Sequence, residues 1–149
     1  MPFLLDVLAL GGGKPEDFSI KKTEAYNTPI YANGITNNGL CGFTNKPVIV
    51  ENSITVSARG TVGFVCNRYE AFCPIGCLIV AIPNRNILLE FLSYALAFLL
   101  SKKGEGTSIP QLTKLKFSST LIPLPPLPEQ KRIVAKIESI FNQLKCLKN

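Results

Sequence analysis

The sequence contains no histidine. This absence excludes Ser-His-Asp and Cys-His catalysis and every zinc site with a histidine ligand. The five cysteines are odd in number and form no CxxC pair, although Cys73 and Cys77 lie four positions apart. Because further metal ligands at workable spacing are missing, we interpret the cysteines as reduced thiols of a cytoplasmic protein.

Long hydrophobic runs are also absent. The first ten residues, MPFLLDVLAL, carry no basic residue, which a signal peptide would need. The most apolar run, residues 87–100, contains Glu90 and is shorter than the roughly 20 residues of a membrane span. We therefore expect a soluble protein with no membrane partner.

Length and composition predict a folded domain with a basic surface. The chain has 149 residues, of which 46% are hydrophobic and 17% charged, and an intrinsically disordered chain would be less apolar. There are 16 lysines and arginines against 10 aspartates and glutamates, so the net charge is +6. A polyanion is a natural partner for such a protein.

Residues 16–82 have the pattern of short strands joined by tight turns. Glycine and asparagine separate the extended runs, as in Asn37-Asn38-Gly39 and Arg59-Gly60, which favours a meandering sheet. Residues 1–10 fit either a short helix or a strand, and GGGKP ends them in both cases. The expected strands are 29–32, 47–50, 54–57, 62–66 and 78–82, with one more near 121–124.

Two helices are expected in the second half of the chain. Residues 85–103 have apolar side chains at steps of three and four, which is typical of a core helix. A polar, basic loop is expected at 104–120. Four prolines then fall between 123 and 128, and Pro128 suits the first turn of a final helix.

The final helix has a narrow apolar seam. Its members recur at steps of four and three, as in a heptad repeat. This pattern predicts either a helix that leaves the body and packs on another helix, which the proline-stiffened approach favours, or a helix folded back on its own domain. The predicted partner-binding residues are Ile133, Ile137, Ile140, Phe141, Leu144 and Leu147, with Val134 beside them.

Enzymatic motifs are missing, and the polar loops favour a binding surface instead. No GxSxG motif and no complete phosphate-binding loop is present. Arginine can bond guanine, asparagine or glutamine can bond adenine, and lysine mainly neutralises phosphate. Arg59 stands out because Gly60 lets the backbone approach a partner. The candidate DNA-binding residues are Lys14, Lys21, Lys22, Asn33, Asn37, Arg59, Arg68, Thr107, Ser108, Gln111, Lys114 and Lys116. For each of them, a solvated loop residue without a ligand is the alternative.

The C-terminal third resembles a known family. STLIPLPPLPEQKRIVAKI at 119–137 is similar to the junction between a target recognition domain and its conserved helix in the DNA specificity subunits of type I restriction–modification systems. Earlier stretches agree in the same order, so that the resemblance covers nearly the whole chain. They are GGGKP at 11–15, PIYANGITNNGLCGFTN at 29–45, VSARGTVGFV at 56–65, FCPIGCLIVAIPN at 72–84 and GEGTSIPQLT at 104–113.

The resemblance implies a mixed α/β fold of the α+β type. A sheet-rich target recognition domain, residues 1–126, would be followed by one long coiled-coil or dimerisation helix, residues 127–149. The helix would pair antiparallel with a second conserved helix and dock the methyltransferase subunits, and through them the restriction or translocase subunit. The chain itself would be non-catalytic and hold no cofactor or metal, since the partner subunits would bind S-adenosylmethionine, ATP and Mg²⁺.

Two departures from the family pattern affect this interpretation. A full specificity subunit has two recognition domains and two helices, whereas this chain has one of each, so it is either a half-subunit that dimerises or a fragment. Lys14 also stands where the family has a small hydroxyl residue, and TSIPQL matches the polar loop imperfectly.

The sequence therefore predicts a module that reads duplex DNA for a type I restriction–modification complex in the cytoplasm. The alternative is a non-catalytic protein-interaction domain whose basic surface binds polyanions without sequence preference.

Overall fold

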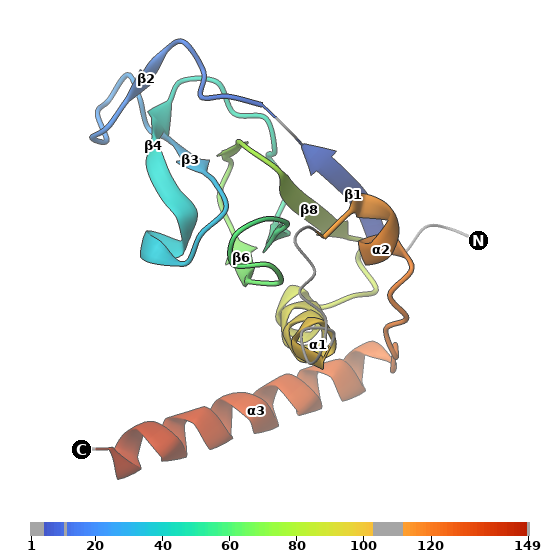
Figure 1. Ribbon diagram of the computed structural model, residues 1–149. Helices are drawn as coiled ribbons and strands as arrows, with labels where there is room; N and C mark the ends of the chain where they lie inside the picture. The colour runs from blue at the N-terminus through green and yellow to red at the C-terminus, as the bar shows by residue number, and fades with distance from the viewer. Residues whose placement is uncertain (1–4, 11, 103–111, 149) are drawn as a thin grey trace.

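The computed structural model describes residues 5–10, 12–102 and 112–148, and its strands form two four-stranded sheets (Figure 1). All neighbours in the first sheet are antiparallel, whereas the second sheet contains one parallel pair, β3 with β7. The first sheet has the order β1 (Leu5–Leu10), β8 (Leu78–Pro83), β5 (Ser53–Ser57) and β6 (Val65–Arg68). The second has the order β2 (Phe18–Ser19), β4 (Leu40–Thr44), β3 (Thr28–Tyr31) and β7 (Cys73–Pro74).

Three α-helices and one 3₁₀ turn accompany the sheets. α1 (Leu89–Lys102) packs on β5 and β6, and α3 (Leu127–Leu147) packs on α1. α1 therefore lies between the first sheet and α3 (Figure 1). The short α2 (Lys114–Ser118) lies beside β1, and the turn η1 (Thr36–Gly39) connects β3 to β4.

β8 supplies side chains to two separate apolar cores. Ile79 packs with the apolar face of α1, whereas Val80 packs with Tyr31 and Phe72 on the opposite side of the sheet. Strands covered on both faces become apolar throughout rather than alternating. This explains the unbroken LIVAI run of β8, a strand of the first sheet whose second face packs on residues of the second sheet.

β5 is buried on both faces but is apolar on only one. Ile54 and Val56 enter the core under α1. On the other face, Thr55 and Ser57 are 2% exposed and accept hydrogen bonds from side-chain and backbone donors near the second sheet. Polar groups buried in this way need partners, and these partners fasten the loops of the candidate site.

Most predicted elements are present, with shifted ends. The mixed α/β class with a long C-terminal helix is confirmed, and the first ten residues contribute a strand. The single meandering sheet was wrong, because two separate sheets form. β2 and β7 have two residues each, too few to show an alternating pattern.

Four local predictions are corrected. Residues 47–50 form no strand, and only Ile49 makes an isolated bridge, to Phe72. Residues 121–124 also form none, because Pro123 lacks the N–H that a strand needs. The core helix begins at Leu89 rather than at 85, after a turn in which Asn84 Oδ1 accepts from the Asn86 N–H at 2.9 Å. The predicted loop 104–120 contains α2.

Candidate nucleic-acid interface

Residues 32–39, the asparagine turn, carry two of the predicted binding residues. Asn37 and Asn38 both have left-handed backbone, at φ 49° and 54°, and Gly39 follows at φ 83°. Asparagine and glycine tolerate this conformation better than other residues. The Ala32 N–H donates to the Gly39 carbonyl at 2.9 Å and closes the turn. Asn37 is exposed, so its amide can meet a ligand.

Asn33 joins the asparagine turn to the loop that carries Arg59. Asn33 is half-buried, and its Oδ1 accepts from the Ala58 N–H at 2.9 Å. The adjacent Gly34 N–H donates to Ser57 Oγ at 3.4 Å. The side-chain oxygen of Asn33 thus has a hydrogen-bond partner in the protein, and the Asn33 side chain lies between the two loops.

Arg59 lies just after the end of β5, and the residue before it is buried. Ala58 is 2% exposed, and its carbonyl accepts from the Leu112 N–H at 2.9 Å. The turn after Arg59 closes where the Gly63 N–H donates to the Ser57 carbonyl at 2.9 Å. Arg59 itself is exposed. The backbone that carries Arg59 is therefore held beside the asparagine turn.

The segment that carries Lys14 lies beside the same turn. The Gly76 N–H donates to the Gly12 carbonyl at 2.8 Å, and a Cβ at Gly76 would lie 3.4 Å from Asn33 Nδ2. Lys14 is exposed, with its ammonium 4.7 Å from the centre of the Phe18 ring. The structure thus brings together three segments that carry predicted residues, namely Lys14, Asn37 and Arg59.

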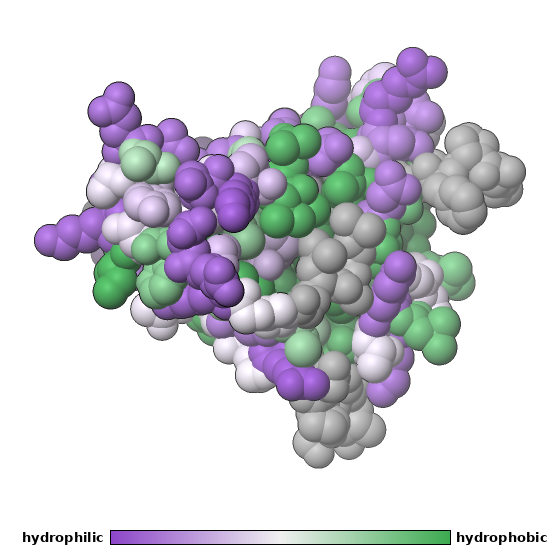
Figure 2. All heavy atoms as spheres, turned by 90° about the horizontal axis from the view of Figure 1, so that it is seen from above, coloured by the Kyte–Doolittle hydropathy of each residue, from purple (hydrophilic) through white to green (hydrophobic). Residues whose placement is uncertain are grey.

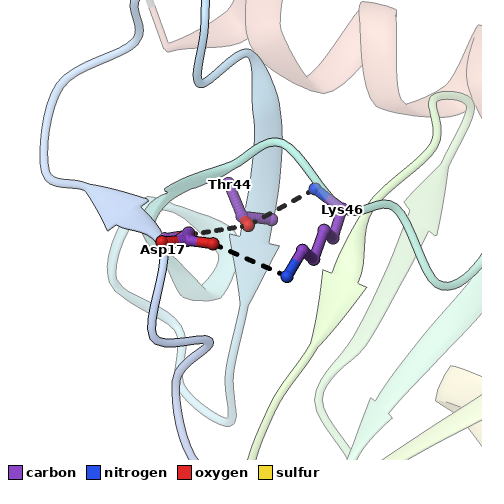
Figure 3. A network of polar contacts seen from close by, with 3 residues as sticks. All are labelled: Asp17, Thr44 and Lys46. Carbon is purple, nitrogen blue, oxygen red and sulfur yellow. Dashed lines mark hydrogen bonds and ion pairs between the residues drawn. The ribbon is translucent and has the colours of Figure 1, made fainter.

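Lys21 and Lys22 follow β2 and are exposed. Polar contacts fasten this short strand to β4: Thr44 Oγ1 donates to the Asp17 carbonyl at 2.8 Å, and Lys46 Nζ lies 3.5 Å from the Asp17 carboxylate (Figure 3). Hydrophilic side chains gather over this end of the second sheet (Figure 2). The two lysines therefore extend a polar surface beyond Lys14.

The predicted residues of the 104–120 segment divide into two groups. Lys114 and Lys116 are exposed on α2, whose first turn is capped by Thr113 Oγ1 accepting from the Lys116 N–H at 3.2 Å. They lie on a helix and not in the predicted loop. Thr107, Ser108 and Gln111 lie outside the described residues, so their role stays a prediction.

Arg68 lies beside a loop, as predicted, but its side chain is buried. It ends β6, is 5% exposed, and its guanidinium carbon lies 3.5 Å from the centre of the Tyr31 ring. Its Nε donates to Thr55 Oγ1 at 3.0 Å, and its Nη2 donates to the Asn38 carbonyl. The apolar alternation of β6 is too short to indicate that this arginine faces inward.

Burial and charge shift the pKa values around Arg68 in opposing ways. Burial lowers the pKa of the Arg68 guanidinium, whereas Cys66, Tyr31 and Glu70 oppose that shift. Burial also raises the pKa of Tyr31, and its hydrogen bond to Glu70 at 2.9 Å raises it further. The phenol thus stays neutral as a donor to Glu70 while its ring faces the guanidinium.

The apolar seam of α3 is only partly covered by its own domain. Val134 is buried, and the helix contacts α1, where the Tyr94 ring lies 6.2 Å from that of Phe141. Toward the C-terminus the exposure rises from 45% at Ile140 to 82% at Leu147. Ile133 and Ile137 are half-buried, and Phe141 and Leu144 are each 49% exposed. The first half of α3 is therefore anchored, while its second half retains an open apolar edge.

Gln130 is a structural residue that was not predicted from the sequence. Its side chain is 0% exposed, and its Oε1 accepts from the Leu88 N–H at 2.8 Å. Its Nε2 donates to the carbonyls of Pro125 at 2.9 Å and Asn86 at 3.0 Å. The available signal was its position one turn before Val134 on the covered face of the helix.

Two classes of site are not found in the described part of the chain. Residues 5–10, 12–102 and 112–148 contain no group of three or more metal-ligating side chains. In the same residues, no helix combines the length and hydropathy required to cross a membrane.

Comparison with known proteins gives one consistent family. The model of the "Type I restriction modification DNA specificity domain" matches residues 3–149. S.MpnORF507P of Mycoplasma pneumoniae, named as a type I specificity subunit, is 36% identical over 135 residues, which cover 90% of this chain and 37% of that protein. The type I restriction enzyme MjaVIII specificity subunit of Methanocaldococcus jannaschii is 33% identical over 147 residues, covering 89% of this chain and 33% of that protein.

A solved structure has the same fold. The HsdS subunit from Thermoanaerobacter tengcongensis superimposes with a TM-score of 0.76 at 23% identity, over 97% of this chain and 37% of that one. At this identity the likeness concerns the fold alone. The chain thus spans between 33% and 37% of the length of these three proteins.

Proposed function

Because this chain belongs to the type I restriction modification DNA specificity domain family, we propose that it reads part of a duplex DNA target and directs a type I restriction–modification complex to it. One observation carries the proposal beyond family membership. Asn37 and Arg59 are exposed on two loops that Asn33 ties together. Base readout requires side chains of this kind on backbone held in a fixed geometry.

The side chains divide into three roles within this proposal. Asn37 and Arg59 contact base edges, since asparagine suits adenine and arginine suits guanine. The exposed lysines neutralise phosphates and give affinity without sequence information; they are Lys14, Lys21, Lys22, Lys114 and Lys116. Arg68 and Asn33 hold the reading loops, because Arg68 is only 5% exposed and the Asn33 side-chain oxygen accepts from the Ala58 N–H of the neighbouring loop.

α3 supplies the connection to the rest of the complex. We assign residues 1–126 to target recognition and 127–149 to a helix that pairs with a second apolar helix, from another copy or from the other part of a longer subunit. The exposed edge from Ile140 to Leu147 supports this pairing. The module is non-catalytic and acts in the cytoplasm with methyltransferase subunits and, through them, the restriction or translocase subunit.

Selection from random duplex DNA tests the proposed function. The chain is used alone and together with its methyltransferase subunits, and bound sequences are recovered over several rounds at fixed salt. We expect a short consensus, with an affinity that also falls as salt rises, because lysines neutralise phosphates. Recovery of no consensus in either arrangement would contradict the proposal and favour a protein-interaction domain with non-specific polyanion binding.

Arg59→Ala in the same selection tests the base-reading assignment. If Arg59 bonds a guanine, its removal lowers the binding free energy for the preferred base at one position by about 1–3 kcal/mol. The base preference at the other positions is unchanged. Lys21→Ala is the matched control, for which a uniform loss across all sequences is expected. A uniform loss for Arg59→Ala as well would make Arg59 a phosphate contact.

A further inference from the structure

Arg68 contacts both sheets and the asparagine turn from a buried position. It ends β6 in the first sheet, and its guanidinium lies over the Tyr31 ring of the second sheet, 3.5 Å from the ring centre. Its Nε donates to Thr55 Oγ1 at 3.0 Å, while Nη2 donates to the Asn38 carbonyl. With 5% of its surface exposed, Arg68 is shielded from a ligand and acts on the protein itself.

The Asn38 carbonyl belongs to a part of the turn whose backbone conformation depends on contacts with other residues. Asn37 and Asn38 are both left-handed, at φ 49° and 54°. A left-handed pair is less stable for residues with a side chain than the ordinary helical or extended conformations, so outside contacts must hold it. The hydrogen bond from Arg68 is such a contact, and it acts on the residue next to Asn37.

We propose that Arg68 is a positioning residue for target reading, which fixes the Asn37–Asn38 pair so that the Asn37 amide meets one base in a set geometry. This inference rests on the proposed function. Arg68, a residue of the first sheet, would thus hold a DNA-reading turn that follows a strand of the second sheet. The base preference at the position that Asn37 reads would then depend on a residue that does not contact DNA.

Arginine suits this role and lysine does not. The guanidinium carbon lies 3.5 Å from the centre of the Tyr31 ring, while Nε donates to Thr55 and Nη2 donates to Asn38. A lysine ammonium keeps the charge but cannot stack and bond both acceptors in this geometry. Arg68→Lys therefore preserves the charge and removes the positioning.

The test compares variants by selection from random duplex DNA, using the chain with its methyltransferase subunits. Asn37→Ala first identifies the base positions that the turn reads. Arg68→Lys is expected to lower preference at those same positions, by about 5- to 100-fold, and to leave the remaining positions and the non-specific affinity unchanged. The double variant should lose no more than Asn37→Ala alone, because the two residues act through one contact. Arg85→Lys, at an exposed arginine, is the matched control and should change nothing.

The outcomes separate the inference from the proposed function. If the wild type selects no consensus, the proposed function itself fails. If a consensus is found but Arg68→Lys keeps full preference at the Asn37 positions, or weakens every position equally, the positioning role is wrong. The role is also wrong if Asn37→Ala changes no position. Thermal unfolding checks that Arg68→Lys is folded, and where it is not, Thr55→Val replaces it, with a smaller loss expected at the same positions.

Discussion

Tyr69 directly follows β6, and its hydroxyl is held between two polar side chains. It donates to Glu90 Oε1 at 2.8 Å and accepts from Asn67 Nδ2 at 3.3 Å. Partial desolvation of the hydroxyl raises the pKa of Tyr69 to about 12, although the residue is 56% exposed, and the hydrogen bond to Glu90 and its negative charge contribute further. At the residue scale, this hydroxyl links the end of the first sheet to α1.

The raised pKa predicts a pH-dependent contribution to stability. The folded protein holds this proton more tightly than the unfolded chain, whose tyrosine pKa is about 10. The stabilisation is therefore fully present below pH 10 and is lost as pH rises toward 12. Tyr69→Phe should remove this part of the pH dependence of the unfolding free energy. In an ultraviolet titration of tyrosinate, it should remove the component that ionises near pH 12.

Tyr26→Phe is the control, since it removes one tyrosine at another place. If the tyrosinate signal lost in Tyr69→Phe titrates near pH 10, as it does in an unfolded chain, the role assigned to Glu90 is contradicted.

Residues of one type have different roles that the sequence does not separate. Asn33 and Asn37 both lie in Gly-rich turn sequence, yet one ties two loops and the other is exposed. Arg59 and Arg68 both follow short apolar runs, yet Arg59 is exposed whereas Arg68 is buried, with an exposed fraction of 5%. The difference arises from which face of a strand meets the other sheet, and no pairing partner is visible in the local sequence.

At the scale of elements, Gln130 fastens α3 to the body. Its amide bonds the backbone on both sides of a junction: Leu88 and Asn86 before α1, and Pro125 before α3. Buried backbone groups without partners are costly, and one side chain here satisfies three of them. The direction in which α3 leaves the body therefore depends on this contact together with the packing of Val134.

Gln130→Leu should destabilise the fold. The substitution leaves one buried N–H and two buried carbonyls without their side-chain partner, and a loss of about 2–4 kcal/mol in unfolding free energy is expected. Gln143→Leu, on the exposed half of the same helix, should change it by less than about 0.5 kcal/mol. Urea unfolding of both variants measures the difference. Equal, small effects would show that Gln130 does not anchor α3.

Element type was predictable where a pattern ran over many residues. The long helices and the apolar β8 carry periodicity or continuous hydrophobicity over six residues or more. β2, β7 and α2 have two to five residues each and were missed. Their existence depends on contacts from elsewhere, such as the Asp17–Thr44 hydrogen bond that holds β2 to β4.

At the scale of the whole molecule, α3 presents an apolar edge that its own domain leaves open. α3 contacts α1 and its Val134 is buried, while Ile140 and Leu144 are 45% and 49% exposed. A seam of this kind is stable in water only while it is short or when another helix covers it. The first half of α3 thus folds back on its own domain, and the second half keeps the apolar edge expected of a helix that packs on another helix.

Leu144→Asp should abolish pairing of α3 and leave the domain folded. A charge in the apolar seam disfavours helix packing, whereas a side chain that is half exposed contributes little to the core. We expect loss of self-association or of methyltransferase docking in sedimentation experiments, with an unchanged thermal midpoint. Gln143→Asp, on the neighbouring position, is the control. Wild-type mass and partner binding for Leu144→Asp would contradict the docking role. Ile137→Asp should abolish pairing too, but it also perturbs the half-buried contact with the body.

The amino-acid sequence was sufficient to predict the class of the protein: a basic, sheet-rich α/β domain, a final helix with a heptad seam, and the motifs of a family. These properties depend on composition, on periodicity within one element and on short contiguous stretches. Which polar residues are exposed and which bond other parts of the protein became clear only from the folded chain. That choice depends on contacts between residues far apart in the chain, such as Arg68 with Asn38 and Gln130 with Leu88, because burial is a property of the assembled sheets and helices.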